Sequence, residues 1–304
     1  MQPRLKNALR RIIEPFREPL LFASQRVPFP NALAFRLPTR WAHRNFKVYM
    51  PEGDFLWRGG SRDSIGYQLC FQGLWHRRFR KPETSLLLDE ISRSRKFLDI
   101  GANTGLFTIA GCAANAQLQV LAVEALPTQS RMLRENIHIN GFERRVIVRE
   151  CALADHDGSV DFHEAEDCTM GSLNTQGYRG QTGRVITVPC TTVDHLLAEE
   201  NFFPDLVKVD VEGFEDVVLG SASNMLQSVR PRLVIEVNAE KDCTALRQIF
   251  AEFDYAVWNI TGDGLVPATE IFPSAAGNNW LCVPTHKLHT ASEDLHGARS
   301  SAPH

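Results

Sequence analysis

From residue 82 onward, short apolar runs alternate with longer segments in which apolar residues recur every three or four positions. The first pattern is typical of buried strands and the second of amphipathic helices. The short runs predict strands at 96–100, 119–123, 146–151, 206–211, 233–237, 255–260 and 280–283. The periodic segments predict helices from Pro82 and at 106–114, 127–140 and 246–253, with one more after Gly213. This alternation predicts a parallel sheet covered by helices on both faces.

These elements predict an α/β protein with a Rossmann-like, doubly wound, mostly parallel seven-stranded sheet and an N-terminal accessory region. We expect the accessory region at 1–81, the main domain at 82–286 and a flexible tail at 287–304. An insertion at about 155–200 separates the third and fourth strands, and two further strands are predicted within it at 160–163 and 185–188. We expect this insertion to form a lid or a wall of the acceptor site, since loops of this kind carry specificity.

The accessory region is basic. Ten basic residues in positions 1–50 are opposed only by Glu14 and Glu18. Apolar residues at helical spacing predict an amphipathic helix from Leu5 to Phe16, and prolines predict irregular chain from there to Trp57. We favour packing of this helix on the main domain. Peripheral contact with a membrane surface or an anionic substrate is the alternative.

The composition excludes several classes of protein. The chain has 304 residues with 43% hydrophobic and 23% charged residues, which is typical of a globular protein and excludes a disordered or collagen-like chain. A net charge of −3 gives no reason to expect a nucleic-acid partner. The seven cysteines include no Cys-x-x-Cys pair, so we expect reduced core residues in a cytoplasmic protein. We find neither an apolar run of about 18 residues nor an uninterrupted signal-peptide core.

The strongest local motif is FLDIGANTG at 97–105, where a strand runs through a glycine-rich turn into a helix. Gly101 and Gly105 allow a ligand to approach the backbone, and the helix directs its N-terminus at that ligand. The spacing is GxxxG, whereas a dinucleotide-binding turn has GxGxxG. A nucleoside without a pyrophosphate therefore fits better, and S-adenosylmethionine is the favoured ligand. An ordinary strand–helix turn is the alternative.

A second signal is Glu124, which ends the next predicted strand about 20 residues after the turn. An acid at this position can accept hydrogen bonds from both ribose hydroxyls of a bound nucleoside. The alternative is an acid at the end of a strand that faces solvent.

A third signal is VKVDVEG at 207–213, in which Lys208, Asp210 and Glu212 share one face of a strand. A buried lysine is costly unless it is paired. In the usual strand order, Asp99 and Glu236 would join them at the carboxyl edge, where open α/β sheets bind ligands. An internal ion-pair network that only holds the strands together is the alternative.

Several segments together resemble one family. They are LDIGANTGLFT (98–108), VEALP (123–127), Arg134-Glu135-Asn136 with Asn140, CALAD (151–155), GSL (171–173), TVDHL (192–196), VKVDVEGFE (207–215) and LVIEVN (233–238). Between about residues 96 and 240 the chain resembles the FkbM-type methyltransferases, within the class I S-adenosylmethionine-dependent enzymes. The resemblance implies O-methylation of a hydroxyl on a small molecule, sugar or glycan, or a secondary metabolite. Alternatives are a protein or RNA acceptor, or an NAD-dependent oxidoreductase with the same sheet.

We assign cofactor binding to the glycine turn, to the acids and to one residue of the CALAD segment: Asp99, Gly101, Ala102, Asn103, Thr104, Gly105, Glu124, Ala152 and Asp210. The chain has VDVEG where base N-methyltransferases have an Asn/Asp-Pro-Pro-aromatic turn, which argues against a nucleobase acceptor.

The predicted catalytic set is Asp210, Lys208, Glu212 and Glu236. Methyl transfer needs alignment of the acceptor oxygen with the methyl group, and an alcohol must also lose its proton. Asp210 is the first candidate for the base, because the family pattern puts it beside the methyl group. Glu212 and Glu236 are alternatives.

Three further groups are candidates for a role in the site: two histidines, a set of possible Mg²⁺ ligands and one serine. His163 and His195 lie in or near the insertion and are more readily explained as structural or exposed. Mg²⁺ could bind Asp210, Glu236 and Asn238, but without a histidine or a third clear carboxylate we assign no metal site. Ser172, in the insertion, is a candidate acceptor contact or an ordinary loop hydroxyl.

Overall fold

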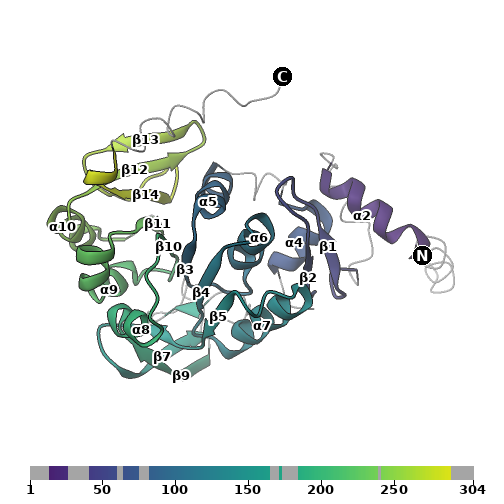
Figure 1. Ribbon diagram of the computed structural model, residues 1–304, viewed down its shortest axis with the longest axis horizontal. Helices are drawn as coiled ribbons and strands as arrows, with labels where there is room; N and C mark the ends of the chain where they lie inside the picture. The colour runs from purple at the N-terminus through teal and green to yellow at the C-terminus, as the bar shows by residue number, and fades with distance from the viewer. Residues whose placement is uncertain are drawn as a thin grey trace.

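The computed structural model describes residues 14–26, 41–59, 64–74, 82–164, 171–172, 184–238 and 241–288. Within these ranges the chain forms an eight-stranded sheet, a four-stranded sheet and a two-stranded hairpin. The large sheet runs through the middle of the molecule, with helices on both sides (Figure 1).

The order of the large sheet is β13-β12-β14-β11-β10-β3-β4-β5. Its strands are β3 (Lys96–Ile100), β4 (Gln119–Val123), β5 (Val146–Arg149), β10 (Leu206–Val209), β11 (Arg232–Glu236), β12 (Tyr255–Thr261), β13 (Gly264–Ala268) and β14 (Asn279–Pro284). The five strands from β11 to β5 pair in parallel, whereas β14 is antiparallel to both of its neighbours and β13 is antiparallel to β12. The predicted doubly wound, mostly parallel sheet is confirmed.

The sheet has one strand more than the seven expected. The extra strand, β13, is an edge strand whose side chains are all partly or fully exposed, and it contains Pro267. Proline is tolerated at a sheet edge because no ladder hydrogen bond is lost there. A strand of this kind has no apolar periodicity, so the sequence pattern did not reveal it.

Helices cover the two faces of the sheet in two layers (Figure 1). One layer contains α5 (Pro82–Arg93), α6 (Leu106–Ala114) and α7 (Pro127–Asn140); the other contains α8 (Val193–Glu199), α9 (Glu215–Gly220) and α10 (Thr244–Glu252). A π-helical turn, η4 (Met225–Val229), precedes β11, and a 3-10 turn, η5 (Thr285–Lys287), follows β14. Alternate residues of the strands point to opposite layers: Phe97 packs in the core on the α5–α7 side, and Leu98 in the core on the α8–α10 side.

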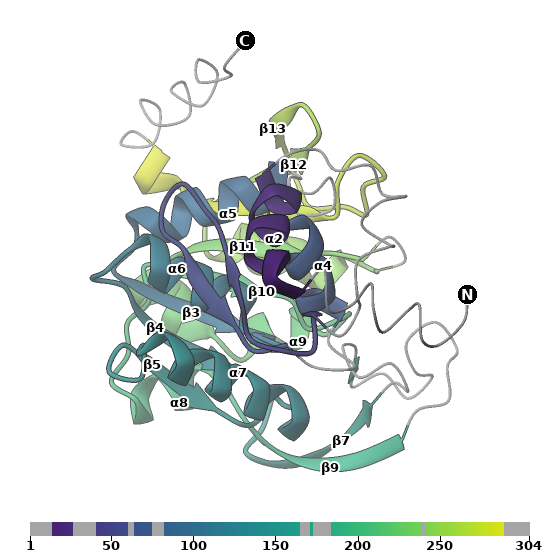
Figure 2. The same ribbon diagram turned by 90° about the vertical axis from the view of Figure 1, so that its right-hand side faces the viewer.

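The N-terminal region packs against the layer that contains α6 and α7. It consists of η1 (Glu14–Phe16), α2 (Arg17–Arg26), β1 (Phe46–Val48), β2 (Phe55–Trp57) and α4 (Ser64–Gln72). Figure 2 shows α2 and α4 lying side by side over the main domain. Leu21, Trp41 and Trp57 are fully buried in the same core as α5 and α6. Helix α2 and the β1–β2 hairpin form where the sequence predicts irregular chain, so that prediction is wrong for these segments.

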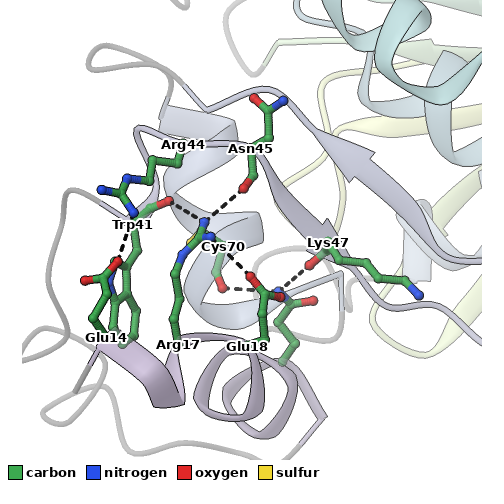
Figure 3. Close-up of polar contacts among 9 residues, drawn as sticks. Glu14, Arg17, Glu18, Trp41, Arg44, Asn45, Lys47 and Cys70 are labelled. Carbon is green, nitrogen blue, oxygen red and sulfur yellow. Dashed lines mark hydrogen bonds and ion pairs between the residues drawn. The ribbon is translucent and has the colours of Figure 1, made fainter. Parts of the chain in front are cut away.

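Polar contacts fix this region internally (Figure 3). The guanidinium of Arg17 donates to the carbonyl oxygens of Trp41 and Asn45, at 3.4 and 2.9 Å. Glu14 accepts hydrogen bonds from Arg44 and from the indole of Trp41, at 2.9 and 3.3 Å. Two of the ten basic residues, Arg17 and Arg44, are therefore hydrogen-bonded within this region. The predicted helix from Leu5 lies outside the described residues up to position 13.

The insertion forms the four-stranded sheet, in the order β6-β9-β7-β8. Its strands are β6 (Ala152–Leu153), β7 (Gly158–Glu164), β8 (Gly171–Ser172) and β9 (Arg184–Thr191). Both strands that the sequence predicted here are present, and both are longer than predicted. β6 follows β5 almost directly and pairs with β9, which attaches the insertion to the carboxyl edge of the large sheet.

Two further expectations can be compared with the described residues. Six cysteines, at positions 70, 112, 151, 190, 243 and 282, are buried and free, as predicted; Cys168 lies outside the described ranges. No helix in the described part of the chain combines the length and apolar character needed to cross a membrane.

Candidate functional site

A cavity lies at the carboxyl ends of four neighbouring strands, β5, β4, β3 and β10. Each strand contributes the residues that follow it: 151–153 after β5, 124–126 after β4, 101–103 after β3 and 210–212 after β10. Because adjacent strands lie about 4.8 Å apart, the four segments follow one another over about 14 Å. The cavity can therefore take an extended ligand of that length across the strand ends.

The glycine turn packs tightly between its neighbours. The N–H groups of Gly101 and Ala102 both donate to the carbonyl of Val123, at 3.0 Å. Gly101 has φ +73°, and a Cβ atom there would lie 1.8 Å from the carbonyl oxygen of Asp210. The close approach of the Asp210 backbone therefore requires this glycine, whereas the sequence predicts the approach of a ligand as the reason. Ala102 and Asn103 line the cavity.

The other two residues assigned in the turn, Thr104 and Gly105, lie behind the cavity wall. Thr104 is buried, and its Oγ1 atom has no hydrogen-bond partner within the described structure. Gly105 has φ +96° and precedes α6, and a Cβ atom there would lie 2.4 Å from Leu133. These two residues shape the turn from behind.

Glu124 is the buried acid of the cavity. Its Oε2 atom accepts the backbone N–H of Asn103 at 2.8 Å, and its Oε1 atom accepts that of Leu126 at 2.9 Å. Burial raises the pKa of Glu124 to about 7, although these two hydrogen bonds oppose the rise. Each carboxylate oxygen can accept a second hydrogen bond, so the side chain retains capacity to accept ligand hydroxyls.

Lys208 and Asp210 form an ion pair at the other end of the cavity. Their Nζ and Oδ2 atoms lie 2.9 Å apart, and both residues line the cavity. Lys208 also lies 5.5 Å from the centre of the Phe107 ring. Burial on its own would lower the pKa of Lys208, but the nearby carboxylates of Asp210 and Asp99 outweigh it, so the pKa is raised and the lysine is charged.

Asp99 lies beside Lys208 in the β3–β10 register, outside the cavity lining. Its Oδ2 atom accepts the Thr108 hydroxyl at 2.6 Å, and its Oδ1 atom has no hydrogen-bond partner among the described residues. Burial raises the pKa of Asp99, and Lys208 opposes the rise. The structure thus brings Asp99, Lys208 and Asp210 together, with Asp99 behind the other two.

The remaining two acids of the predicted catalytic set lie in different surroundings. The strand ends at Val209, and Glu212 lines the cavity from a turn in which its φ is +52°. Its Oε2 atom accepts Asn238 at 3.3 Å. Glu236 is outside the cavity lining and accepts the side-chain amide of Asn278 at 2.5 Å, so Glu212 is the better placed alternative to Asp210.

The insertion and the N-terminal region each contribute to the cavity wall a residue that the sequence did not identify. Phe162 of β7, in the predicted acceptor wall, and Ile65 of α4 both line the cavity, as does Ala152, which was predicted. Ile65 had no signal, because it lies in a short helix outside the family resemblance. His195 is exposed and pairs with Asp157 at 2.7 Å, away from the cavity.

His163 and Ser172 are described only through their backbones, and the question of a metal site concerns the acids. The backbones of His163 and Ser172 pair across β7 and β8, while their side chains lie outside the description. In the described ranges, no three His, Cys, Asp or Glu side chains gather as metal ligands.

A mostly parallel sheet with a glycine turn after one strand and an acid after the next is typical of doubly wound proteins that bind nucleosides or nucleotides. Residues 99–257 match the model of the methyltransferase FkbM domain. The chain belongs to this family of methyltransferases, which overturns the oxidoreductase alternative.

Three similar proteins illustrate the relationship. The chain is 28% identical over 168 residues to the hexuronic acid methyltransferase AglP of Haloferax volcanii, an alignment that covers 55% of this chain and 66% of that protein. A methyltransferase FkbM structure from Methylobacillus flagellatus has a TM-score of 0.42 and 17% identity, covering 83% of this chain and 58% of that one. An O-methyltransferase from Bacillus cereus, solved in complex with SAH, has a TM-score of 0.38 and 13% identity, covering 89% of this chain and 98% of that one.

Proposed function

We propose that this protein transfers a methyl group from S-adenosylmethionine to a hydroxyl group of a sugar, a glycan or a similar small molecule. The observation that carries the proposal is the order of chemical groups along the cavity. Apolar residues follow β5, the acid Glu124 follows β4, the open glycine turn follows β3, and the Lys208–Asp210 pair follows β10. This order matches adenine, ribose and a charged amino-acid tail in sequence.

The cavity residues fit this cofactor. Ala152, Leu126 and Phe162 provide an apolar surface for a purine ring, and Glu124 can accept ribose hydroxyls. The described lining residues include three acids, Glu124, Asp210 and Glu212, against one lysine, which favours a ligand with a positively charged sulfonium. When bound, the cofactor supplies an electrophilic methyl group to an oxygen nucleophile.

Asp210 is the residue proposed to take the proton of the acceptor hydroxyl. It lines the cavity, and its side chain is 28% exposed, whereas that of Lys208 is only 8% exposed. Lys208 holds Oδ2, so Oδ1 is the oxygen proposed to accept the proton. In this role Lys208 orients the carboxylate, and Glu212 on the following turn hydrogen-bonds the acceptor.

Support for a sugar acceptor comes from two sources. The relative AglP is named for hexuronic acid methylation. The cavity lining also includes an apolar side chain, Ile65, and two carboxylates, those of Asp210 and Glu212, that can accept hydrogen bonds from hydroxyl groups. Because those carboxylates repel anions, a neutral hydroxyl acceptor is favoured over a sugar carboxylate. No metal ion is required in this proposal.

Calorimetry with S-adenosylhomocysteine, with NAD as the comparator, tests the cofactor. We expect binding of the first and none of the second; absence of S-adenosylhomocysteine binding would overturn the proposal. Transfer from methyl-labelled S-adenosylmethionine to neutral sugars, to hexuronic acids and to protein and RNA fractions tests the acceptor. We expect an alkali-stable methyl ether on a sugar, formed equally well with a chelator present. An alkali-labile ester would show that the acceptor is a carboxylate.

A further inference from the structure

A chain of hydrogen bonds runs from the N-terminal hairpin to the acid proposed to bind ribose. The backbone N–H of Arg58, directly after β2, donates to Oδ1 of Asn136 over 2.6 Å. Nδ2 of Asn136 donates to the carbonyl of Thr104 over 2.9 Å. The N–H of Thr104 donates to Oδ1 of Asn103 over 2.7 Å, and the N–H of Asn103 donates to Oε2 of Glu124 over 2.8 Å. In each bond the donor lies on the hairpin side, and the first two bonds share the conjugated amide of Asn136, so the first polarises the second.

Helix α7 holds the middle of this chain. Asn136 is 0% exposed, and both ends of its amide are used, one by the hairpin and one by the glycine turn. One helical turn later, Asn140 bonds the hairpin through both the N–H and the carbonyl of Leu56, at 2.7 Å each. Asn140 therefore shares the docking role of Asn136 and makes no bond to the glycine turn, which provides a matched comparison.

We propose that Asn136 is a positioning residue that makes the affinity for the cofactor depend on docking of the N-terminal hairpin. This inference rests on the proposed function, because it takes the cavity as the S-adenosylmethionine site. When the hairpin is docked, the Arg58 N–H fixes the amide of Asn136 in the orientation that holds Thr104. Without that donor, a buried Oδ1 is left unsatisfied, and the amide must turn toward another partner. The carbonyl of Thr104 is then released, and the hold on Asn103 and Glu124 is weakened.

The same region already takes part in the site, because Ile65 of α4 lines the cavity and α4 contacts β1 of the hairpin. Arg58 itself lies outside the cavity lining and is exposed, so an effect of its backbone on cofactor affinity cannot come from direct contact. The hairpin thus acts at a distance through one side-chain amide.

Linkage requires the coupling to act in both directions. In the full-length wild-type protein, saturating S-adenosylhomocysteine should therefore slow hydrogen exchange at the Arg58 amide several-fold. This measurement needs no variant. Unchanged exchange at Arg58 in a protein that binds S-adenosylhomocysteine would overturn the coupling and leave the proposed function intact. No binding by the wild type would overturn the proposed function itself.

Two pairs of variants separate positioning from general stability. Arg58→Pro removes the donor N–H, whereas Arg58→Ala keeps it and removes only the 3.1 Å ion pair with Glu135. Asn136→Ala removes the link to the turn, whereas Asn140→Ala removes docking bonds and a 2.8 Å bond to the Asn136 backbone carbonyl, and leaves the link to the turn in place. We expect the Kd for S-adenosylhomocysteine to rise about tenfold in Arg58→Pro and Asn136→Ala, as for loss of one buried hydrogen bond. The two control variants should stay within about threefold.

Hydrogen exchange within residues 101–105 gives a second measurement for the same variants. It should accelerate in Arg58→Pro and Asn136→Ala and stay unchanged in the controls. Equal Kd values across all four folded variants would refute the proposal. If either Arg58→Pro or Asn136→Ala fails to fold, the other of these two variants and the wild-type exchange experiment still test the proposal.

Discussion

The Nζ atom of Lys208 donates a hydrogen bond to Oδ2 of Asp210 over 2.9 Å. Asp210 is two residues further along the chain and directly follows the end of β10 at Val209. The lysine is almost fully buried, and the aspartate reaches the cavity. The pair therefore links the interior of the sheet to the end of the cavity at which methyl transfer is proposed to occur. A change in either residue alters the charge at that end: loss of Lys208 removes the ion-pair partner of Asp210, and loss of Asp210 leaves the buried Lys208 with Asp99 as the neighbouring carboxylate.

Replacement of Asp210 by asparagine should separate chemistry from cofactor binding. The amide keeps the shape and cannot take a proton, so the methyl-transfer rate should fall by about 10²-fold or more. S-adenosylhomocysteine should still bind, because the proposed ribose and adenine contacts are distant, although its Kd should rise by a few-fold, since Asp210 lies where the amino-acid tail is proposed to bind. Glu212→Gln is the matched carboxylate variant, and it should cost far less rate. Full activity in Asp210→Asn would move the role of the base to Glu212.

Replacement of Glu124 by glutamine should act on the cofactor. The variant removes a charged acceptor, at a cost of about 1.5–3 kcal/mol for hydrogen bonds to a charged group, which is roughly 10- to 100-fold in Kd. The rate at saturating cofactor should change little. Asp157→Asn, which alters an exposed acid paired with His195, serves as the control. A rate that collapses with unchanged cofactor affinity would show that Glu124 has another role.

The affinity for the cofactor should depend on pH through Glu124. Its pKa of about 7 in the free protein means that a substantial fraction is protonated at neutral pH. Because ribose hydroxyls donate to the ionised form, binding favours loss of the proton, and affinity should fall as pH drops from 8 to 6, by up to about tenfold. Calorimetry across this range measures the effect. The Glu124→Gln variant should show no such dependence.

The same shift has the opposite sign for folding stability. The pKa of Glu124 is raised in the folded state, so its favourable contribution is fully present below the unfolded value of 4.5 and is lost as pH rises through about 7. Acidification from 8 to 6 should thus weaken cofactor binding while this residue's contribution to the free energy of unfolding increases.

Two glycines with the same backbone conformation provide a test of the turn geometry. Gly101 and Gly141 have φ values of +73° and +70°, but a Cβ atom would meet the Asp210 carbonyl at 1.8 Å in the first case and nothing within 4 Å in the second. Gly141→Ala should cost about 1–2 kcal/mol, from backbone strain alone. Gly101→Ala should cost more than about 3 kcal/mol, because the β10 backbone must also move. Equal melting temperatures for the two variants would contradict this packing.

Truncation can distinguish packing from membrane contact in the N-terminal region. Removal of residues 1–26 deletes the buried Leu21 and Gln25, the latter bonded to Lys47, Cys70 and Tyr49, so the melting temperature should fall by several degrees. Removal of residues 1–13 leaves these contacts in place and deletes most of the predicted amphipathic helix, so a lower melting temperature of this form would support packing of that helix on the main domain. Both forms would be sedimented with anionic vesicles at low and high salt. Salt-sensitive binding lost with residues 1–13 would support a role at the membrane surface.

The sequence predicted the part of the fold in which periodicity and burial agree. Strands 96–100 and 119–123 and helices 106–114 and 127–140 have the predicted bounds, because each is apolar on the face or faces that it buries. The alternation in VKVDVEG predicts a strand over 206–211, which is longer than β10. The alternating pattern continues after Val209, although the chain has left the sheet there. The ion pair of Lys208 was anticipated because a buried lysine needs a partner.

The walls of the cavity were much harder to predict. Ile65 and the β1–β2 hairpin belong to short elements whose position depends on tertiary contacts, and such contacts leave no periodic trace in the sequence. Asn136 was part of the family resemblance, but its two hydrogen bonds join segments 78 and 32 residues away. No local pattern can reveal a link of that kind.

The amide of Asn140 also covers backbone groups at the edge of the hairpin. A β-strand at the edge of a hairpin offers unpaired N–H and carbonyl groups to any strand of another molecule. Both backbone groups of Leu56 are already bonded to the Asn140 side chain, in the way that a neighbouring strand would bond them. Leu56 is itself exposed and apolar, a combination that would otherwise favour edge-to-edge association. Asn140, the last residue of α7, thus occupies at Leu56 the backbone groups that a strand of another molecule would need for pairing.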